Sequence, residues 1–131
     1  MKIGINVRTE DYSRAVKRKA RDGSIKSLGH AGAVIRLIAR RSIRKRKGRS
    51  QPGTAPHSRQ GALRRAIVYA VEARSERVVI GPDYAVVGDS ARAHEFGGYY
   101  RGDRYERRPF MGPALLKTRD RLPEHWAGSV S

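Results

Sequence analysis

The chain has 131 residues, of which 29 are Lys or Arg and 12 are Asp or Glu, so its formal net charge is +17. This length predicts a single domain, 1–131, with one modest core, because folding a chain of this size hides roughly two thirds of its surface. The absence of Cys excludes disulfides and thiolate sites, and no apolar run approaches the roughly 18 residues that a membrane span needs, so we expect no membrane partner.

The charge is distributed unevenly along the chain. Residues 1–50 carry 16 basic and 3 acidic side chains, whereas residues 51–131 carry 13 and 9. The first part, 1–50, is therefore a basic arm or helix. Such a segment favours either a polyanion such as DNA or an acidic protein surface as its partner.

The basic part contains a short strand pattern and a longer helix pattern. Alternation over Ile3–Val7 predicts a half-buried strand. Glu10–Arg21 is either an earlier helix or an extension of the next one, interrupted near Gly23 and Gly29. Leu28–Arg46 has the spacing of an amphipathic helix, with an apolar stripe made of Ala31, Val34, Ile35, Leu37, Ile38, Ser42 and Ile43.

Two strand-like runs follow a long loop. Residues 47–60 contain two Pro and two Gly and no large aliphatic residue, so we expect a long loop that serves as a contact element. Gly61–Arg65 is then a loop-to-strand entry. Ile67–Ala73 and Arg77–Ile80 predict an antiparallel hairpin, and Tyr84–Val87 predicts a third short strand.

The C-terminal part predicts a helical turn, a second loop and a final helix. These are Ser90–Phe96, the polar stretch 97–108, and a helix that begins at Pro109 and runs towards Leu122, where Pro123 ends or kinks it. The expected fold class is α+β, with a long amphipathic helix and a C-terminal helix packed on a small antiparallel β-sheet.

Residues able to support catalysis are few. The four His are scattered and form no H-E-x-x-H spacing, and the chain has no glycine-rich phosphate cradle. His94-Glu95 is the best candidate pair for a hydrolase, but a polar pair at a helix end explains it more simply. We expect no enzyme activity, no metal and no cofactor.

The strongest electrostatic feature is the basic run that ends the long helix. Its expected polyanion contacts are Arg40, Arg41, Arg44, Lys45, Arg46 and Lys47. Several phosphate contacts would give salt-dependent binding that ignores base sequence. A solvated helix end that meets an acidic neighbour explains the same run equally well.

Three segments in order resemble a known family. They are Pro52–Ile67 (PGTAPHSRQGALRRAI), His94–Gly98 (HEFGG) and Arg108–Leu115 (RPFMGPAL). Together they are similar to the motifs of tailed-bacteriophage tail-completion or head–tail joining proteins, a group of virion morphogenesis and minor tail proteins. This chain departs from the pattern at Gln60 and Ala66, and 98–107 resembles an insertion.

The resemblance implies a structural phage protein in the neck of the virion, assembled in the host cytoplasm as a ring, a hexamer, between head connector and tail. It leaves tail completion and tail termination both open. The interface residues expected are Arg49, Pro52, Pro56, Arg59, Arg64, Glu95, Tyr99, Tyr100 and Arg108. The structural anchors expected are Gly61, Leu63, Ile67, Phe96, Gly97, Pro109, Phe110 and Pro113. The alternative function is that of a small basic nucleic-acid-binding protein.

Overall fold

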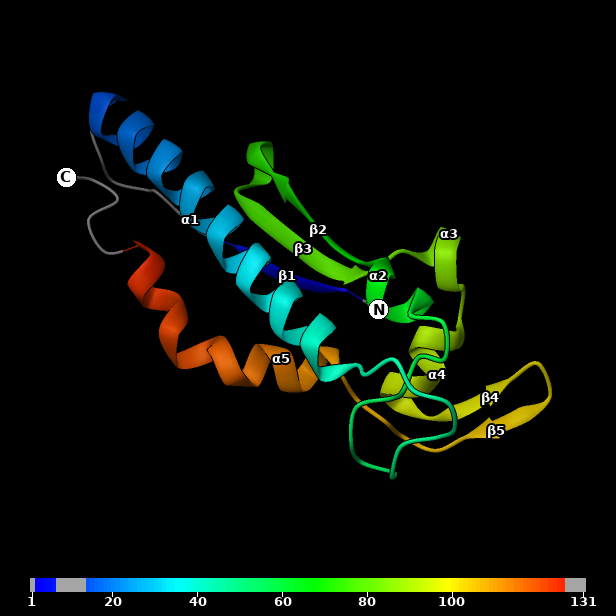
Figure 1. Ribbon diagram of the computed structural model, residues 1–131. Coiled ribbons are helices and arrows are strands. Elements are labelled where there is room, and N and C mark those ends of the chain that lie inside the picture. Colours follow the sequence, from blue (N-terminus) through cyan, green and yellow to red (C-terminus); the bar gives the residue numbers. More distant parts are fainter. Residues whose placement is uncertain (1, 7–13, 127–131) are drawn as a thin grey trace.

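The computed structural model describes residues 2–6 and 14–126 (Figure 1). Its longest element is helix α1, Arg14–Ser42, which continues through Gly23 and Gly29 without a break. The described part of the predicted segment Glu10–Arg21 therefore belongs to the same helix, and its first residues lie outside the described ones. The fold is α+β, as the sequence predicts.

Helix α1 ends earlier than its apolar pattern predicts. The Ser42 hydroxyl donates to the Ala39 carbonyl (2.7 Å) and the Ile43 N–H donates to the Arg40 carbonyl (3.2 Å), which tightens the last turn. Beyond it, Arg44 forms an isolated bridge with His57, and its carbonyl accepts from the Ser58 N–H (2.9 Å). The extension of the helix to Arg46 was therefore wrong, because the chain has already turned to pair with the loop that follows.

The buried face of α1 is narrower than the predicted stripe. Leu28, Ala31, Ile35 and Ala39 are buried at helical spacing. Val34 and Leu37 belong to the predicted apolar stripe but are 39% and 45% exposed, so the stripe is wider than the buried face. Ile43, just after the helix, is fully buried.

A three-stranded antiparallel sheet lies against α1 (Figure 1). Its strands are β1 (Ile3–Asn6), β2 (Ile67–Glu72) and β3 (Arg77–Pro82), in the order β1-β3-β2. Ile80 pairs with both Ile3 and Tyr69, which aligns these side chains on the face that packs with α1. The opposite face is uncovered, since Gly4, Val68 and Ala70 are exposed.

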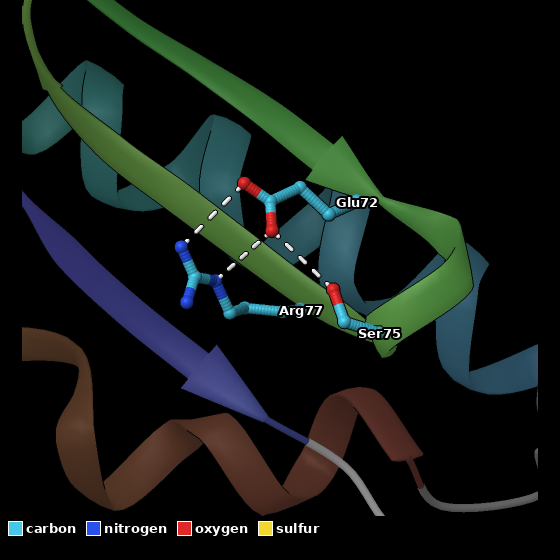
Figure 2. Close-up of polar contacts among 3 residues, drawn as sticks. All are labelled: Glu72, Ser75 and Arg77. Carbon is cyan, nitrogen blue, oxygen red and sulfur yellow. Dashed lines mark hydrogen bonds and ion pairs between the residues drawn. The ribbon is translucent and has the colours of Figure 1, made fainter.

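The predicted β2–β3 hairpin is confirmed, with a 3₁₀ turn, Ala73–Ser75, as its connection. Glu72 closes it: its carboxylate pairs with the Arg77 guanidinium (3.2 Å) and accepts from the Ser75 hydroxyl (3.3 Å), as Figure 2 shows. Glu72 and Arg77 also face each other across the strands. The two side chains are 42% and 48% exposed, so the pair fixes the turn and adds little stability.

Two short segments form helices where strand or loop structure was expected. Residues after Gly61 form α2, Ala62–Ala66. Tyr84–Val87 is helix α3, so the prediction of a third strand there was wrong. The reason is capping: the Asp83 carboxylate accepts from the Ala85 N–H (3.0 Å), and this bond outweighs the strand preference of Tyr and Val. Helix α4, Ser90–Phe96, confirms the predicted helical turn.

The stretch 97–108, predicted as a loop, contains a second hairpin. Strands β4 (Gly98–Tyr100) and β5 (Asp103–Tyr105) pair antiparallel across Arg101 and Gly102, which both have positive φ. Two positive φ values are what a tight two-residue hairpin turn requires. Figure 1 shows this hairpin projecting from the end of the molecule beyond α4.

The C-terminal elements pack along α1. Helix α5, Met111–Thr118, is followed by a 3₁₀ segment, η2 (Arg119–Trp126). The helix begins after Phe110 and ends at Thr118, so it is shorter than the predicted Pro109–Leu122. One core cluster joins α1, the sheet and α5 through Leu28, Ile35, Ile67, Val78, Ile80, Phe110 and Met111.

Candidate functional site

A depression of about 370 Å³ lies between the C-terminal end of α1 and helix α2. We call it the basic groove, and its lining residues are Leu37, Arg40, Arg41, Lys45, Gly61, Arg64 and Arg65. Five of the seven carry a positive charge. Residues from two elements that are separate in the sequence therefore form a single cationic surface.

Backbone carbonyls hold two of these guanidinium groups in place. Arg40 Nε donates to the Ile67 carbonyl (3.2 Å) and its Nη2 donates to the Arg65 carbonyl (3.0 Å), where α2 passes into β2. Arg65 Nη1 donates to the Gln60 carbonyl (2.8 Å) at the start of α2. Each guanidinium keeps further N–H groups for another acceptor, because it has five donors.

The cations of the groove repel one another. Burial lowers the pKa of Arg40 from its usual value, and the positive charges of Arg36 and Arg64 lower it further. No acidic residue occurs between Asp22 and Glu72, so this part of the chain supplies no counter-charge. Among the described residues, the ion pairs of Arg21, Arg77 and Arg119 all lie outside the groove.

The structure divides the predicted polyanion contacts. Arg40, Arg41 and Lys45 line the groove. Arg44, Arg46 and Lys47 are exposed but do not line it. From the sequence, Arg64 is a predicted interface residue, and Arg65 is expected to be available for contacts with no partner assigned. Only the helical form of α2 brings both to the end of α1.

Two of the three segments that resemble phage tail-completion proteins, the second and the third, meet at Glu95. The buried Glu95 carboxylate accepts from the backbone N–H groups of Phe110 (2.8 Å), Met111 (3.0 Å) and Gly112 (2.8 Å), at the start of α5. A side chain at Gly112 would meet Glu95 Oε1 at 3.2 Å, so a glycine leaves room for this contact. We call this arrangement the Glu95 junction.

The first segment joins the same region through its loop. The Gly53 N–H donates to the Arg107 carbonyl (2.8 Å), and buried Arg108 donates through Nε to the Ser50 carbonyl (2.9 Å). A small cleft of about 50 Å³ is lined by residues of all three segments, including Pro56, His94 and Arg108. The loop 47–60 is therefore attached to the body at several points.

These contacts correct three of the predicted interface residues. Pro56, Glu95 and Arg108 are buried, so none of them offers a surface for a neighbouring molecule. The buried hydrogen bonds of Glu95 and Arg108 satisfy polar groups within the chain, which is a structural role. The other predicted interface residues are exposed or half-buried: Arg49, Pro52, Arg59, Arg64, Tyr99 and Tyr100.

One predicted anchor is also corrected. Phe96 is 63% exposed, because it ends α4 on the solvent side, next to the projecting hairpin. Tyr99 on that hairpin is 78% exposed. We call the β4–β5 hairpin together with Phe96 the aromatic arm. Its inner side is fixed by edge-to-face contacts of Tyr105 with His94 (5.2 Å) and Tyr100 (5.9 Å).

The remaining anchors occupy structural positions. Leu63, Ile67 and Phe110 are buried in the core. Gly61 and Gly97 have positive φ, and a Cβ at Gly97 would meet the Tyr105 carbonyl at 3.3 Å. Pro109 and Pro113 are half-buried, before and inside the first turn of α5.

The His94–Glu95 pair is not arranged for acid–base chemistry. Both Glu95 oxygens accept backbone N–H groups, which leaves the carboxylate committed to the start of α5. Burial lowers the pKa of His94, and the charges of Arg108 and Arg49 lower it further. Within residues 2–6 and 14–126, no group of three or more His, Asp or Glu is placed to hold a metal ion.

Among the described helices, none is long and apolar enough to cross a membrane. Comparisons with protein-family models, with curated proteins and with solved structures found no match to this chain. The functions proposed below for the basic groove and the aromatic arm are therefore based on this chain's own residues.

Proposed function

We propose that the chain is a non-enzymatic structural subunit of a tailed-phage neck, which joins the head connector to the tail as part of an oligomeric ring. The observation that carries this proposal is the Glu95 junction. The second and third segments that resemble the family's motifs are hydrogen-bonded to each other there, and the first segment lines a small cleft beside them. Because the motif-like segments lie together in the structure, they support a resemblance in fold.

The exposed surfaces support assembly from identical subunits. A cyclic ring needs a heterologous interface, in which one surface meets a different surface of the next copy. The hairpin of the aromatic arm projects from one end of the molecule (Figure 1), and Phe96 and Tyr99 of the arm are exposed. The uncovered face of the sheet presents Val68 and Ala70 elsewhere. The proposed ring has six subunits, which is the number that the resemblance implies.

Electron microscopy of a lysate tests this proposal, with the gene disrupted in the parent phage or prophage and restored in a control. We expect filled heads and finished tails that lie unjoined. Overlong tails would instead assign the protein to tail termination. Normal joined particles without the gene would overturn the structural function altogether.

Complementation with arm variants sharpens the test. Phe96→Ser with Tyr99→Ser removes two exposed aromatic side chains and no hydrogen bond described for them, so the subunit should fold. We expect this variant to leave heads and tails unjoined. Arg92→Gln, at an exposed position on neighbouring α4, is the control and should restore joining.

A further inference from the structure

The basic groove concentrates positive charge that the chain does not neutralise. Arg40, Arg41, Lys45, Arg64 and Arg65 line one depression, and the acid-free stretch between Asp22 and Glu72 contains all of them. Like charges at this spacing oppose folding unless an anion lies between them. Burial, and then the positive charges of Arg36 and Arg64, lower the pKa of Arg40, which is consistent with this crowding.

The chemistry of the groove suits the oxygens of a phosphate. Four of its five cations are guanidinium groups, whose fork of N–H donors matches two phosphate oxygens. Arg40 and Arg65 are already fixed by carbonyls, so binding immobilises fewer side chains. No aromatic residue lines the groove, so it has no platform on which an unpaired base could stack.

We propose that the basic groove is a binding site for the phosphate backbone of double-stranded nucleic acid, and that it holds the duplex without reading its base sequence. Arg41, Lys45 and Arg64 make the phosphate contacts from the two walls of the groove. Arg40 and Arg65 position the walls by their bonds to the carbonyls of Ile67, Arg65 and Gln60. The proposal is independent of ring formation, because every residue in it comes from one chain.

The test is fluorescence anisotropy of the purified full chain with labelled 20-base-pair DNA duplexes of two unrelated sequences, over a range of salt concentrations. The groove variant replaces three exposed cations with Gln, namely Arg41, Lys45 and Arg64. The control variant removes the same charge at three exposed positions outside the groove and the aromatic arm, namely Arg74, Arg92 and Lys117. No side chain of these six makes a hydrogen bond or ion pair with a described residue, so both variants should fold.

We expect the parent to bind both duplexes with equal affinity. The slope of log affinity against log salt should become shallower by about 0.9 for each phosphate contact removed, so by roughly 2.7 in the groove variant. Its affinity should also fall by at least about tenfold, since each contact contributes separately. The control variant should keep most of the parent's slope and affinity.

Three results would overturn the proposal. Equal losses in the two variants would mean that net charge alone attracts the DNA. Tighter binding to a single strand than to the duplex would mean that bases are held elsewhere, for example on the tyrosines of the aromatic arm. Displacement of the duplex by an equal charge concentration of polyglutamate would mean that the groove accepts an acidic protein surface instead.

Discussion

Glu95 shows how one side chain can organise two distant segments. Its carboxylate satisfies three N–H groups that the first turn of a helix leaves without intrahelical partners. A negative charge at this end of α5 also interacts favourably with the helix dipole. Glu95 lies in a segment that resembles a family motif, and the sequence predicts it as an interface residue. In the structure it instead fixes the start of α5.

Replacing Glu95 with Ala should therefore destabilise the fold strongly. The change leaves three N–H groups in or near the core without an acceptor, at a cost of about 3 kcal/mol in the free energy of unfolding. Glu95→Gln keeps one acceptor oxygen and should lose about half as much. Urea unfolding followed by circular dichroism measures both, and an Ala variant as stable as the parent would contradict the assigned role.

His94 gives the fold a pH dependence whose sign follows from its surroundings. Burial, and then the charges of Arg108 and Arg49, lower its pKa below the ordinary value of 6.5. On acidification, His94 therefore becomes protonated near pH 6.5 in the unfolded chain, whereas in the folded chain it is protonated only at lower pH. This contribution to stability is complete above pH 6.5 and is lost as the pH falls from there towards the lower pKa of the folded state.

We accordingly expect His94→Gln to flatten the loss of stability on acidification. Urea unfolding at about pH 7.5 and about pH 5.5 gives the change in free energy of unfolding for parent and variant. The parent should lose more stability than the variant over this interval. The same loss in both proteins would show that other groups account for it.

At the scale of elements, the packing of α1 on the sheet depends on a glycine. A Cβ at Gly32 would lie 2.7 Å from Tyr69 Cδ2 and 2.8 Å from Val78 Cγ2, so the helix approaches β2 and β3 too closely for any side chain. One turn earlier, a Cβ at Gly29 would meet Val71 Cγ2 at 3.9 Å, an ordinary contact. The two glycines of one helix are thus under different constraints.

Alanine substitutions at these two positions should have opposite effects. Gly29→Ala should stabilise the protein by up to about 1 kcal/mol, because alanine is the better helix former. Gly32→Ala gains the same propensity, but overpacking costs about 1–3 kcal/mol, and we expect a net loss. Thermal unfolding of both variants measures the difference, and stabilisation by both would show that the helix can move away from the sheet.

The elements that the sequence predicts well are those with a regular apolar period. Helix α1 and the β2–β3 hairpin have such a period. The β4–β5 hairpin does not, because its strands are polar and its turn, Arg101-Gly102, lacks the usual Asn-Gly or Asp-Gly signal. Helix α3 was missed because Asp83, whose carboxylate caps it, was interpreted only as part of a turn.

The candidate site was only half predictable, for a related reason. A run of charges identifies Arg40, Arg41 and Lys45 without knowledge of the fold. Arg64 and Arg65 join them through tertiary structure, when α2 packs beside the end of α1. The burial of Glu95 could not be predicted from the sequence either. The hydrogen bonds that compensate for burying its carboxylate come from residues 15 to 17 positions away.

At the scale of the whole molecule, the net charge of +17 affects every association of the chain. Copies of a strongly basic protein repel one another, and salt screens this repulsion, with a Debye length of about 10 Å at 0.1 M. A polyanion is attracted instead, and salt weakens that attraction through counterion release. Self-association and nucleic-acid binding should therefore respond to salt in opposite directions.

Sedimentation velocity of the full chain without nucleic acid tests this contrast. Raising the salt concentration from about 0.05 M to about 0.3 M should increase the oligomer fraction, because the contact that we propose for the aromatic arm is apolar and repulsion is what opposes it. Phe96→Ser with Tyr99→Ser should remain monomeric at both concentrations. Dissociation of the parent oligomer at the higher salt would show that ion pairs hold the subunits, and the arm would then be excluded as the main contact.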